Sequence, residues 1–264
     1  MHKIGIMQGR LSKAPTGACL DWFPFPNWQE EFNIANKLGF NYIELVVNRY
    51  ESFKNPLFSD ESIKKLKKLI IENNLEFVSC CANNIIEENI FSNNVIDNLS
   101  NLKKNLNLIG IRILILPLFG KSELKEYKVD SISKKLNRLL SKNNTVQILI
   151  ESDAPLDIQR KLVEKTKKNI GIVYDIGNSA FDKRNIYREI PNNLDIIKHI
   201  HIKDKNKKGI NTKLGNGIVN LKELKKIIKL IPENIMLTLE TTRGNEDIFL
   251  EQKNNLDYIK NLYK

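Results

Sequence analysis

Four side chains that can bind a metal or move protons stand at the ends of short apolar runs in the second half of this 264-residue chain. They are Glu151, Asp175, His201 and Glu240. Buried carboxylates that converge on one place need a cation. Three carboxylates and one imidazole suit a divalent ion, so these residue types predict a metal site. Mn²⁺ is the first choice, with Mg²⁺, Co²⁺ and Zn²⁺ as alternatives.

Each of these residues also has a simpler structural interpretation. A single acidic residue at the end of an apolar run is more often a helix cap or an ion-pair partner than a metal ligand. Four residues in equivalent positions on successive runs favour a shared site. His199 shares a strand face with His201 by alternation, and we predict that it is a packed or hydrogen-bonded neighbour. His2 is predicted to lie at the surface.

The elements that position these residues can be predicted from the hydropathy pattern. Short runs rich in β-branched residues alternate with longer amphipathic stretches. The predicted strands are 3–7, 42–47, 76–81, 111–116, 146–150, 170–174, 197–202 and 235–239. The predicted helices are 28–38, 60–72, 95–108, 131–142, 156–168, 221–230 and 247–262, with a weaker segment at 187–194 that Pro191 interrupts.

Eight strand–helix units in 264 residues allow about 33 residues each, which matches a (β/α)8 TIM barrel. The active site of such a barrel lies at the carboxyl ends of its strands. An open doubly wound sheet is the alternative, but Gly9 and Arg10 after the first strand do not belong to a Gly-x-Gly-x-x-Gly turn. We therefore predict an α/β chain that forms a single domain over residues 1–264.

The remaining candidate residues would contact the substrate. Arg10 could bind a carboxylate or phosphate, or it could anchor the long first loop. Glu44 could hydrogen-bond a hydroxyl or hold a partner side chain. The basic loop 204–213 follows the seventh strand, and Lys207, or another lysine of this loop, could bind a phosphate. The alternative is that this loop is only solvated.

Composition limits the classes of protein. With 42 Lys+Arg and 31 Asp+Glu, the formal net charge is +11, which suits anionic partners or a solvated surface. No run of 18 apolar residues is present, and the N-terminus does not resemble a signal peptide. The three cysteines, Cys19, Cys80 and Cys81, favour a reducing cytoplasm over a disulfide framework. They form no Cys-x-x-Cys pair, so we expect no cysteine zinc cluster.

Taken together, these motifs resemble the xylose-isomerase-like superfamily of sugar isomerase and epimerase barrels. The resemblance rests on residues 4–11, 38–44 and 214–220, on the four strand endings, and on the order His201-Ile202-Lys203-Asp204. This superfamily also contains ketose 3-epimerases, hydroxypyruvate isomerase, inosose dehydratase and endonuclease IV. Each motif is weak alone, but their order and spacing cover almost the whole chain.

The resemblance implies a role for each ligand. Glu151 and Glu240 would be both metal ligands and the acid–base pair, on opposite faces of a cis-enediolate. Asp175 and His201 would be ligands only. Many relatives have a histidine where this chain has Asn178, which can hydrogen-bond a substrate hydroxyl but cannot carry a proton at neutral pH. Endonuclease IV relies on several metal ions held largely by histidines, and with three histidines in the whole chain we do not expect DNA cleavage.

The sequence thus predicts a cytoplasmic, metal-dependent isomerase or epimerase of a sugar or sugar phosphate. We expect no membrane or nucleic-acid partner. A homo-oligomer is possible on the sequence alone. A dehydratase of the inosose or dehydroshikimate type and a non-catalytic sugar-binding barrel are the alternatives. A charge-driven nucleic-acid binder would show binding that weakens steeply with salt.

Overall fold

The structure is a computed structural model that describes residues 1–18, 20, 22–50, 52–141, 145–166, 170–243 and 247–263, with only the backbone described at 221 and 222. The chain divides into two compact units. The first consists of Met1–Glu44, Asn73–Glu76 and Val173–Lys264, and the second of Leu45–Glu72 and Phe77–Ile172. Two of the boundaries fall inside strands, one in β2 (Tyr42–Val47) and one in β6 (Ile170–Asp175).

Parallel strands form the centre of the first unit. Strand β1 (Ile4–Met7) pairs with the first half of β2 on one side and with β10 (Met236–Leu239) on the other. Strand β10 pairs in turn with β7 (Ile197–Ile202). The core positions of these strands are apolar and buried, as expected for strands covered on both faces.

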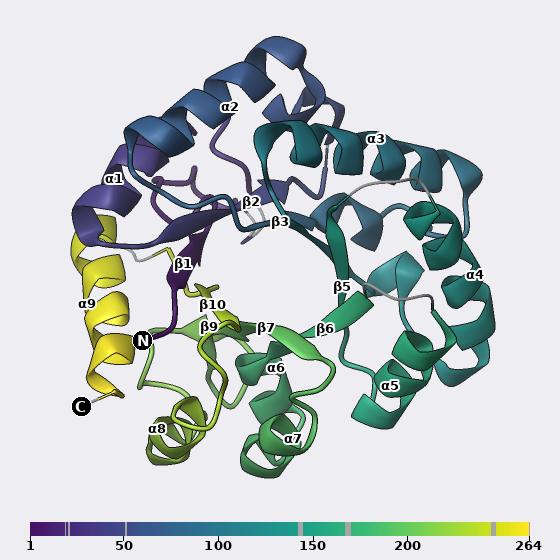
Figure 1. Ribbon diagram of the computed structural model, residues 1–264. Helices are drawn as coiled ribbons and strands as arrows, with labels where there is room; N and C mark the ends of the chain where they lie inside the picture. The colour runs from purple at the N-terminus through teal and green to yellow at the C-terminus, as the bar shows by residue number, and fades with distance from the viewer. Residues whose placement is uncertain are drawn as a thin grey trace. The chain divides into compact units, whose positions relative to one another are not determined.

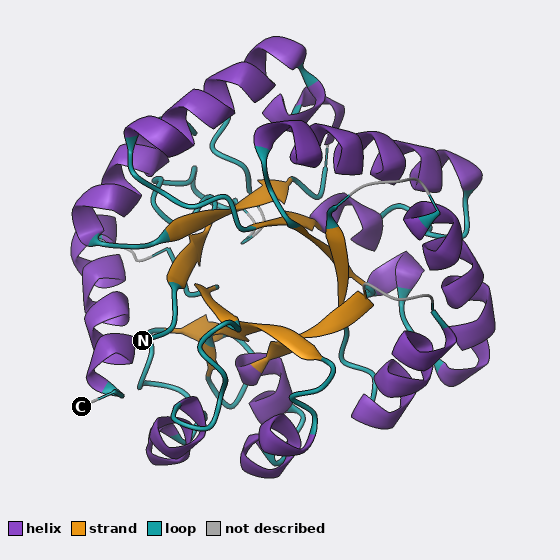
Figure 2. Cartoon of the chain, in the orientation of Figure 1, coloured by secondary structure: helices purple, strands orange, loops and turns teal. Residues whose placement is uncertain are grey.

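Helices follow the strands of the first unit (Figure 2). Helix α1 (Glu30–Leu38) ends at Gly39, whose φ of 87° allows its N–H to bond the carbonyls of Ala35 and Asn36. Helix α1 and helix α9 (Ile248–Asn261), at opposite ends of the chain, lie side by side (Figure 1). The others are α6 (Ile176–Phe181), α7 (Ile186–Asn192) and α8 (Leu221–Ile228).

The second unit repeats the alternation. The second half of β2 pairs with β3 (Ser79–Ala82), β3 with β4 (Ile113–Pro117), and β4 with β5 (Gln147–Glu151), all parallel. Its helices are α2 (Asp60–Glu72), α3 (Asn93–Ile109), α4 (Val129–Leu140) and α5 (Leu156–Lys165). Helix α2 buries Ile63, Leu66 and Ile70, so its apolar residues lie on one face as their spacing predicts.

The predicted strands all form, and the bounds of β2 and β7 are as predicted. Strand β3 begins at Ser79 rather than at residue 76, because residues 76–78 are still in the connection. The predicted ends of two helices, at residues 142 and 168, lie outside the described residues. Pro191 does not stop helix α7, which continues to Asn192. A proline that close to the end removes little helical hydrogen bonding.

A short helix and a short hairpin are among the elements that were not predicted. Helix α6 begins directly after β6. Strands β8 (Asp204–Lys205) and β9 (Asn211–Thr212) pair antiparallel, so the basic loop is a hairpin. Both are short, so they carry too few residues to show a hydropathy period.

The prediction for His2 is wrong, because its ring is buried. Nδ1 lies 2.5 Å from the Tyr263 hydroxyl, and Nε2 lies 3.1 Å from the carbonyl oxygens of Ile231 and Pro232. These partners are more than 200 residues away, so local sequence carried no sign of them.

Cys80 and Cys81 are buried thiols that form no disulfide with any described residue, whereas Cys19 lies outside the described residues. Within the part of the chain that is described, no helix has both the length and the apolar character needed to cross a membrane.

Candidate functional site

Three of the four predicted metal ligands converge within the first unit. Asp175 ends β6, His201 lies near the end of β7, and Glu240 follows β10. Their ligand atoms lie within 4.8 Å of one another, and all three side chains are buried. His201 Nδ1 is 3.3 Å from Glu240 Oε2. Parallel strands end at the same edge of a sheet, which brings these distant residues together.

A lysine lies between the two carboxylates. The Nζ of Lys203 is 2.6 Å from Asp175 Oδ2 and 3.0 Å from Glu240 Oε2, and the residue is only 7% exposed. Gly177, in α6, makes room for it. A Cβ there would lie 2.5 Å from Lys203 Cγ and 2.9 Å from its carbonyl oxygen. The absence of a side chain at 177 therefore lets Lys203 run past the start of α6 into the acidic cluster.

The two carboxylate oxygens of Asp175 have different partners. Oδ1 accepts a hydrogen bond of 2.8 Å from the backbone N–H of Asn178 and caps α6, whereas Oδ2 faces Lys203. One oxygen of Asp175 therefore caps a helix, as the simpler interpretation predicted, and the other belongs to the acidic cluster. The side-chain Oδ1 of Asn178 is buried and has no hydrogen-bond partner among the described residues.

Glu44 lies in the part of β2 that belongs to the first unit. It contacts both histidines of β7. Its Oε1 lies 2.9 Å from His201 Nε2, and its Oε2 lies 3.2 Å from His199 Nε2. Thr238 Oγ1 donates to Glu44 Oε2 at 3.2 Å and lies 2.7 Å from His199 Nε2. With Nε2 of His201 held by Glu44, its Nδ1 faces Glu240 and is the nitrogen that could bind a metal.

The charges of this cluster shift the pKa of its members. Burial raises the pKa of Glu44, but the charge of His201 and the contacts with both histidines outweigh it, so the pKa falls below its usual range. Burial likewise raises the pKa of Glu240, but the charges of Lys203, His201 and Arg10 hold it below its usual range. Burial lowers the pKa of His199, so its ring is neutral near pH 7.

Arg10 is buried beside the cluster. Its guanidinium donates to the carbonyl of Leu20 at 2.6 Å and lies 3.9 Å from Glu240 Oε1. Arg10 therefore anchors the first loop and pairs with one oxygen of Glu240, whereas Lys203 pairs with the other.

Asp204 organises the loop that follows the hairpin. This fully buried carboxylate accepts backbone N–H bonds from Gly215, Gly217 and Val219 at 3.1, 2.9 and 3.1 Å. A Cβ at Gly217 would lie 2.0 Å from Asp204 Oδ1, so the close approach needs glycine. The motif around residues 214–220 is thus held in place by the aspartate that follows Lys203.

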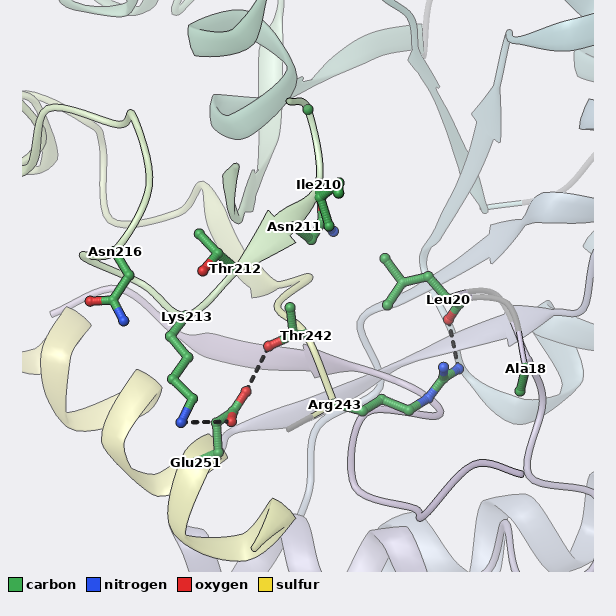
Figure 3. A pocket seen from close by; sticks show the side chains of 11 residues that line it. Ala18, Leu20, Ile210, Asn211, Thr212, Lys213, Asn216, Thr242, Arg243 and Glu251 are labelled. Atoms are coloured by element: carbon green, nitrogen blue, oxygen red, sulfur yellow. Dashed lines mark hydrogen bonds and ion pairs between the residues drawn. The ribbon is translucent and has the colours of Figure 1, made fainter. Parts of the chain in front are cut away.

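A cavity of about 800 Å³ lies in the same unit (Figure 3). Its walls come from the first loop, from the hairpin and from the segment after β10. On one side Glu251 accepts from Thr242 at 2.6 Å and pairs with Lys213 at 3.3 Å. On another, Arg243 donates to the same Leu20 carbonyl that Arg10 uses, at 2.6 Å. This shared carbonyl links the wall of the cavity to the residues around Glu240.

Two further predicted residues are Glu151 and Lys207. Glu151 is the last residue of β5, in the second unit. It is buried, and its carbonyl accepts from the Leu118 N–H at 2.8 Å. Lys207 is exposed at the turn of the hairpin and is not among the described residues that line the cavity, whereas Lys213 is. The residue most clearly missed is Lys203. The alternation His199, His201, Lys203 could have revealed it, because the three share one face.

Comparisons with known proteins complete the description. No curated protein matches the sequence. Among solved structures, an L-ribulose 3-epimerase is 15% identical, with a TM-score of 0.78 over 99% of this chain and 94% of that one. The D-psicose 3-epimerase of Clostridium cellulolyticum H10, solved with D-tagatose, is 14% identical, with a TM-score of 0.76 over 99% of each chain. An IOLI protein with a bound zinc atom is 15% identical, with a TM-score of 0.73 over 99% of each chain.

At these identities the solved structures show a common fold. A family profile described as xylose isomerase-like TIM barrel matches residues 32–262, most of the chain. This match confirms the predicted (β/α)8 fold and the predicted resemblance, and the chain belongs to the family of xylose isomerase-like TIM barrels.

Proposed function

We propose that this protein is a divalent-metal-dependent isomerase or epimerase that acts on a sugar or sugar phosphate. The observation that carries the proposal is the convergence of Asp175, His201 and Glu240, whose ligand atoms lie within 4.8 Å of one another at strand ends. Support also comes from the structural neighbours, two of which are named as sugar 3-epimerases and one of which binds zinc.

The donors fit a divalent cation. Asp175 Oδ2, His201 Nδ1 and Glu240 Oε2 would hold it, and we propose Glu151 as the fourth ligand because it ends β5 of a barrel whose site lies at the strand ends. Lys203 and Arg10 lie beside Asp175 and Glu240, and a divalent ion would supply the further positive charge that additional buried carboxylates need. Mn²⁺ is proposed first, with Mg²⁺, Co²⁺ and Zn²⁺ as alternatives.

The chemistry divides between the metal and the side chains. A bound metal would act as a Lewis acid on neighbouring carbonyl and hydroxyl oxygens of the sugar. Glu240 Oε1, the oxygen 3.9 Å from the Arg10 guanidinium, would take a proton from the carbon beside the carbonyl. Glu151 would hold a proton at the start of the cycle and donate it to the opposite face of the cis-enediolate, and both glutamates would exchange protons with water before the next turnover. Donation to the opposite face inverts the stereocentre, and donation to the other carbon moves the carbonyl.

Other residues would position the sugar. Asn178 Oδ1 is buried without a partner among the described residues, and we propose that it accepts from a substrate hydroxyl. Glu44 would act through the orientation of His201 rather than by touching the sugar. Arg10 and Lys207 are proposed contacts for an anionic group. Lys213, which lines the cavity, is the lysine of that loop best supported for a phosphate.

The test is exchange with solvent deuterium in a panel of ketoses and ketose phosphates. Wild-type protein loaded with Mn²⁺ should place deuterium on the carbon beside the carbonyl. Glu240→Gln and Glu151→Gln should each abolish that exchange while leaving the circular dichroism spectrum unchanged. The surface variant Glu87→Gln should exchange at the wild-type rate.

The alternatives give different results in the same experiment. Product that absorbs as an enone, with loss of water, would indicate a dehydratase and contradict the epimerase mechanism. Purified protein that binds no divalent metal and turns over no ketose would favour a sugar-binding barrel without catalysis.

A further inference from the structure

Lys203 lies where the donor atoms of the metal cluster meet. Its Nζ is within 3.0 Å of both Asp175 Oδ2 and Glu240 Oε2. Glu240 Oε2 is also the oxygen nearest His201 Nδ1, at 3.3 Å. The other oxygen of each carboxylate has a different neighbour: Asp175 Oδ1 accepts from the Asn178 N–H, and Glu240 Oε1 lies 3.9 Å from the Arg10 guanidinium. The ammonium therefore contacts the same two oxygens that a metal would need.

The fold supports this position of the lysine. Lys203 is almost fully buried, and its carbon stem passes the start of α6 at Gly177, where any side chain would collide with it. A buried ammonium is costly unless it is paired, and here it is paired with two carboxylates. Without it, Asp175 would lose its ion pair, and Glu240 would keep only the contacts with Arg10 and His201.

We propose that the Lys203 ammonium competes with the divalent metal for Asp175 Oδ2 and Glu240 Oε2, and thereby sets the metal affinity of the site. The lysine stabilises the acidic cluster in protein stripped of metal, and it must move away from these oxygens when a metal binds. This inference rests on the metal site of the proposed function. It adds that the affinity is weakened by a residue of the chain itself.

The test uses Lys203→Met, which keeps a long unbranched side chain beside Gly177 and removes the charge. Protein is stripped with a chelator and titrated with Mn²⁺ alone by isothermal titration calorimetry. Lys203→Met should bind Mn²⁺ at least about tenfold more tightly than wild type, because two carboxylate oxygens lose a competing unit charge. It should also melt at a lower temperature than wild type when stripped, and gain more in melting temperature from saturating Mn²⁺.

Lys198→Met is the matched control. Lys198 is half-buried on β7 and by strand alternation points to the other face from His199 and His201. The Lys198→Met variant loses one lysine charge near the same strand, and the cluster is unchanged. Its Mn²⁺ affinity should therefore equal that of wild type.

The outcomes separate the two proposals. Equal or weaker Mn²⁺ binding by Lys203→Met overturns the competition and leaves the metal-dependent function standing. No binding by either protein overturns both. If stripped Lys203→Met does not fold, Lys203→Gln keeps a hydrogen-bond donor without the charge. It should still bind Mn²⁺ more tightly than wild type, and equal affinity there refutes the proposal.

Discussion

The contact between Glu44 and His201 gives a sharp prediction about metal binding. Glu44 is 0% exposed, and its two oxygens lie 2.9 Å from His201 Nε2 and 3.2 Å from His199 Nε2. Replacement by glutamine keeps the shape but leaves one oxygen and one NH₂ group to face the two rings. With its oxygen toward His201, the ring stays oriented and loses only the negative charge that makes Nδ1 a stronger ligand. With its NH₂ toward His201, the proton must sit on Nδ1, which then cannot bind a metal.

The size of the effect follows from these two orientations. Loss of a carboxylate partner behind a ligating histidine typically costs about 10- to 100-fold in metal affinity, roughly 1.4–2.8 kcal/mol. The first orientation of the introduced glutamine corresponds to the lower limit and the second to the upper one. We expect Glu44→Gln to weaken Mn²⁺ binding within this range.

The assay is calorimetric titration of stripped protein with Mn²⁺, beside the control Glu31→Gln. Glu31 is also a fully buried carboxylate of the first unit, but it accepts from the backbone N–H groups of Gly9 and Leu11 and contacts no proposed ligand. Glu31→Gln should lower the free energy of unfolding and leave Mn²⁺ affinity unchanged. If Glu44→Gln binds Mn²⁺ as tightly as wild type, the reasoning that Glu44 orients His201 is wrong.

Other perturbations test separate parts of the structure. Asp204→Asn should lower the free energy of unfolding by about 2–4 kcal/mol in urea titrations, because an amide cannot accept from three backbone N–H groups; an unchanged midpoint would contradict this. Burial lowers the pKa of His2 below 6.5, so the folded state binds fewer protons than the unfolded chain and stability falls as pH drops below 6.5. His2→Asn should reduce that slope by up to about 1.4 kcal/mol per pH unit, whereas a parallel stability–pH curve would refute the assignment. Removal of metal by a chelator should abolish deuterium exchange, and Mn²⁺ should restore it; exchange that survives in stripped protein would contradict the proposed mechanism.

The fold was predictable because it depends on patterns that are local in the sequence. Strands β2 and β7 and helix α2 have the predicted bounds, since β-branched runs and an apolar spacing of three and four residues specify them directly. Helix α1 ends at Leu38, the predicted residue. Helix α6 was missed because it is short and is capped by the side chain of Asp175, which hydropathy does not show. The β8–β9 hairpin was missed because its two-residue strands carry no hydropathy period.

The residue types of the candidate site could be predicted from the sequence, but the contacts between their side chains could not. The positions of Asp175, His201 and Glu240 follow from one rule, that parallel strands end at the same edge. Lys203 was not predicted as a site residue because lysine is usually exposed. It nevertheless continues the alternation of His199 and His201.

The sequence by itself determined the alternation of strands and helices, the family, and which acidic and imidazole residues stand at the strand ends. Only the tertiary structure decided how they are connected: Lys203 between Asp175 and Glu240, Glu44 behind His201, and His2 buried near the C-terminus. The physical reason is that periodicity acts over a few residues, whereas charge pairing and desolvation act between side chains that are close in space and far apart in the chain.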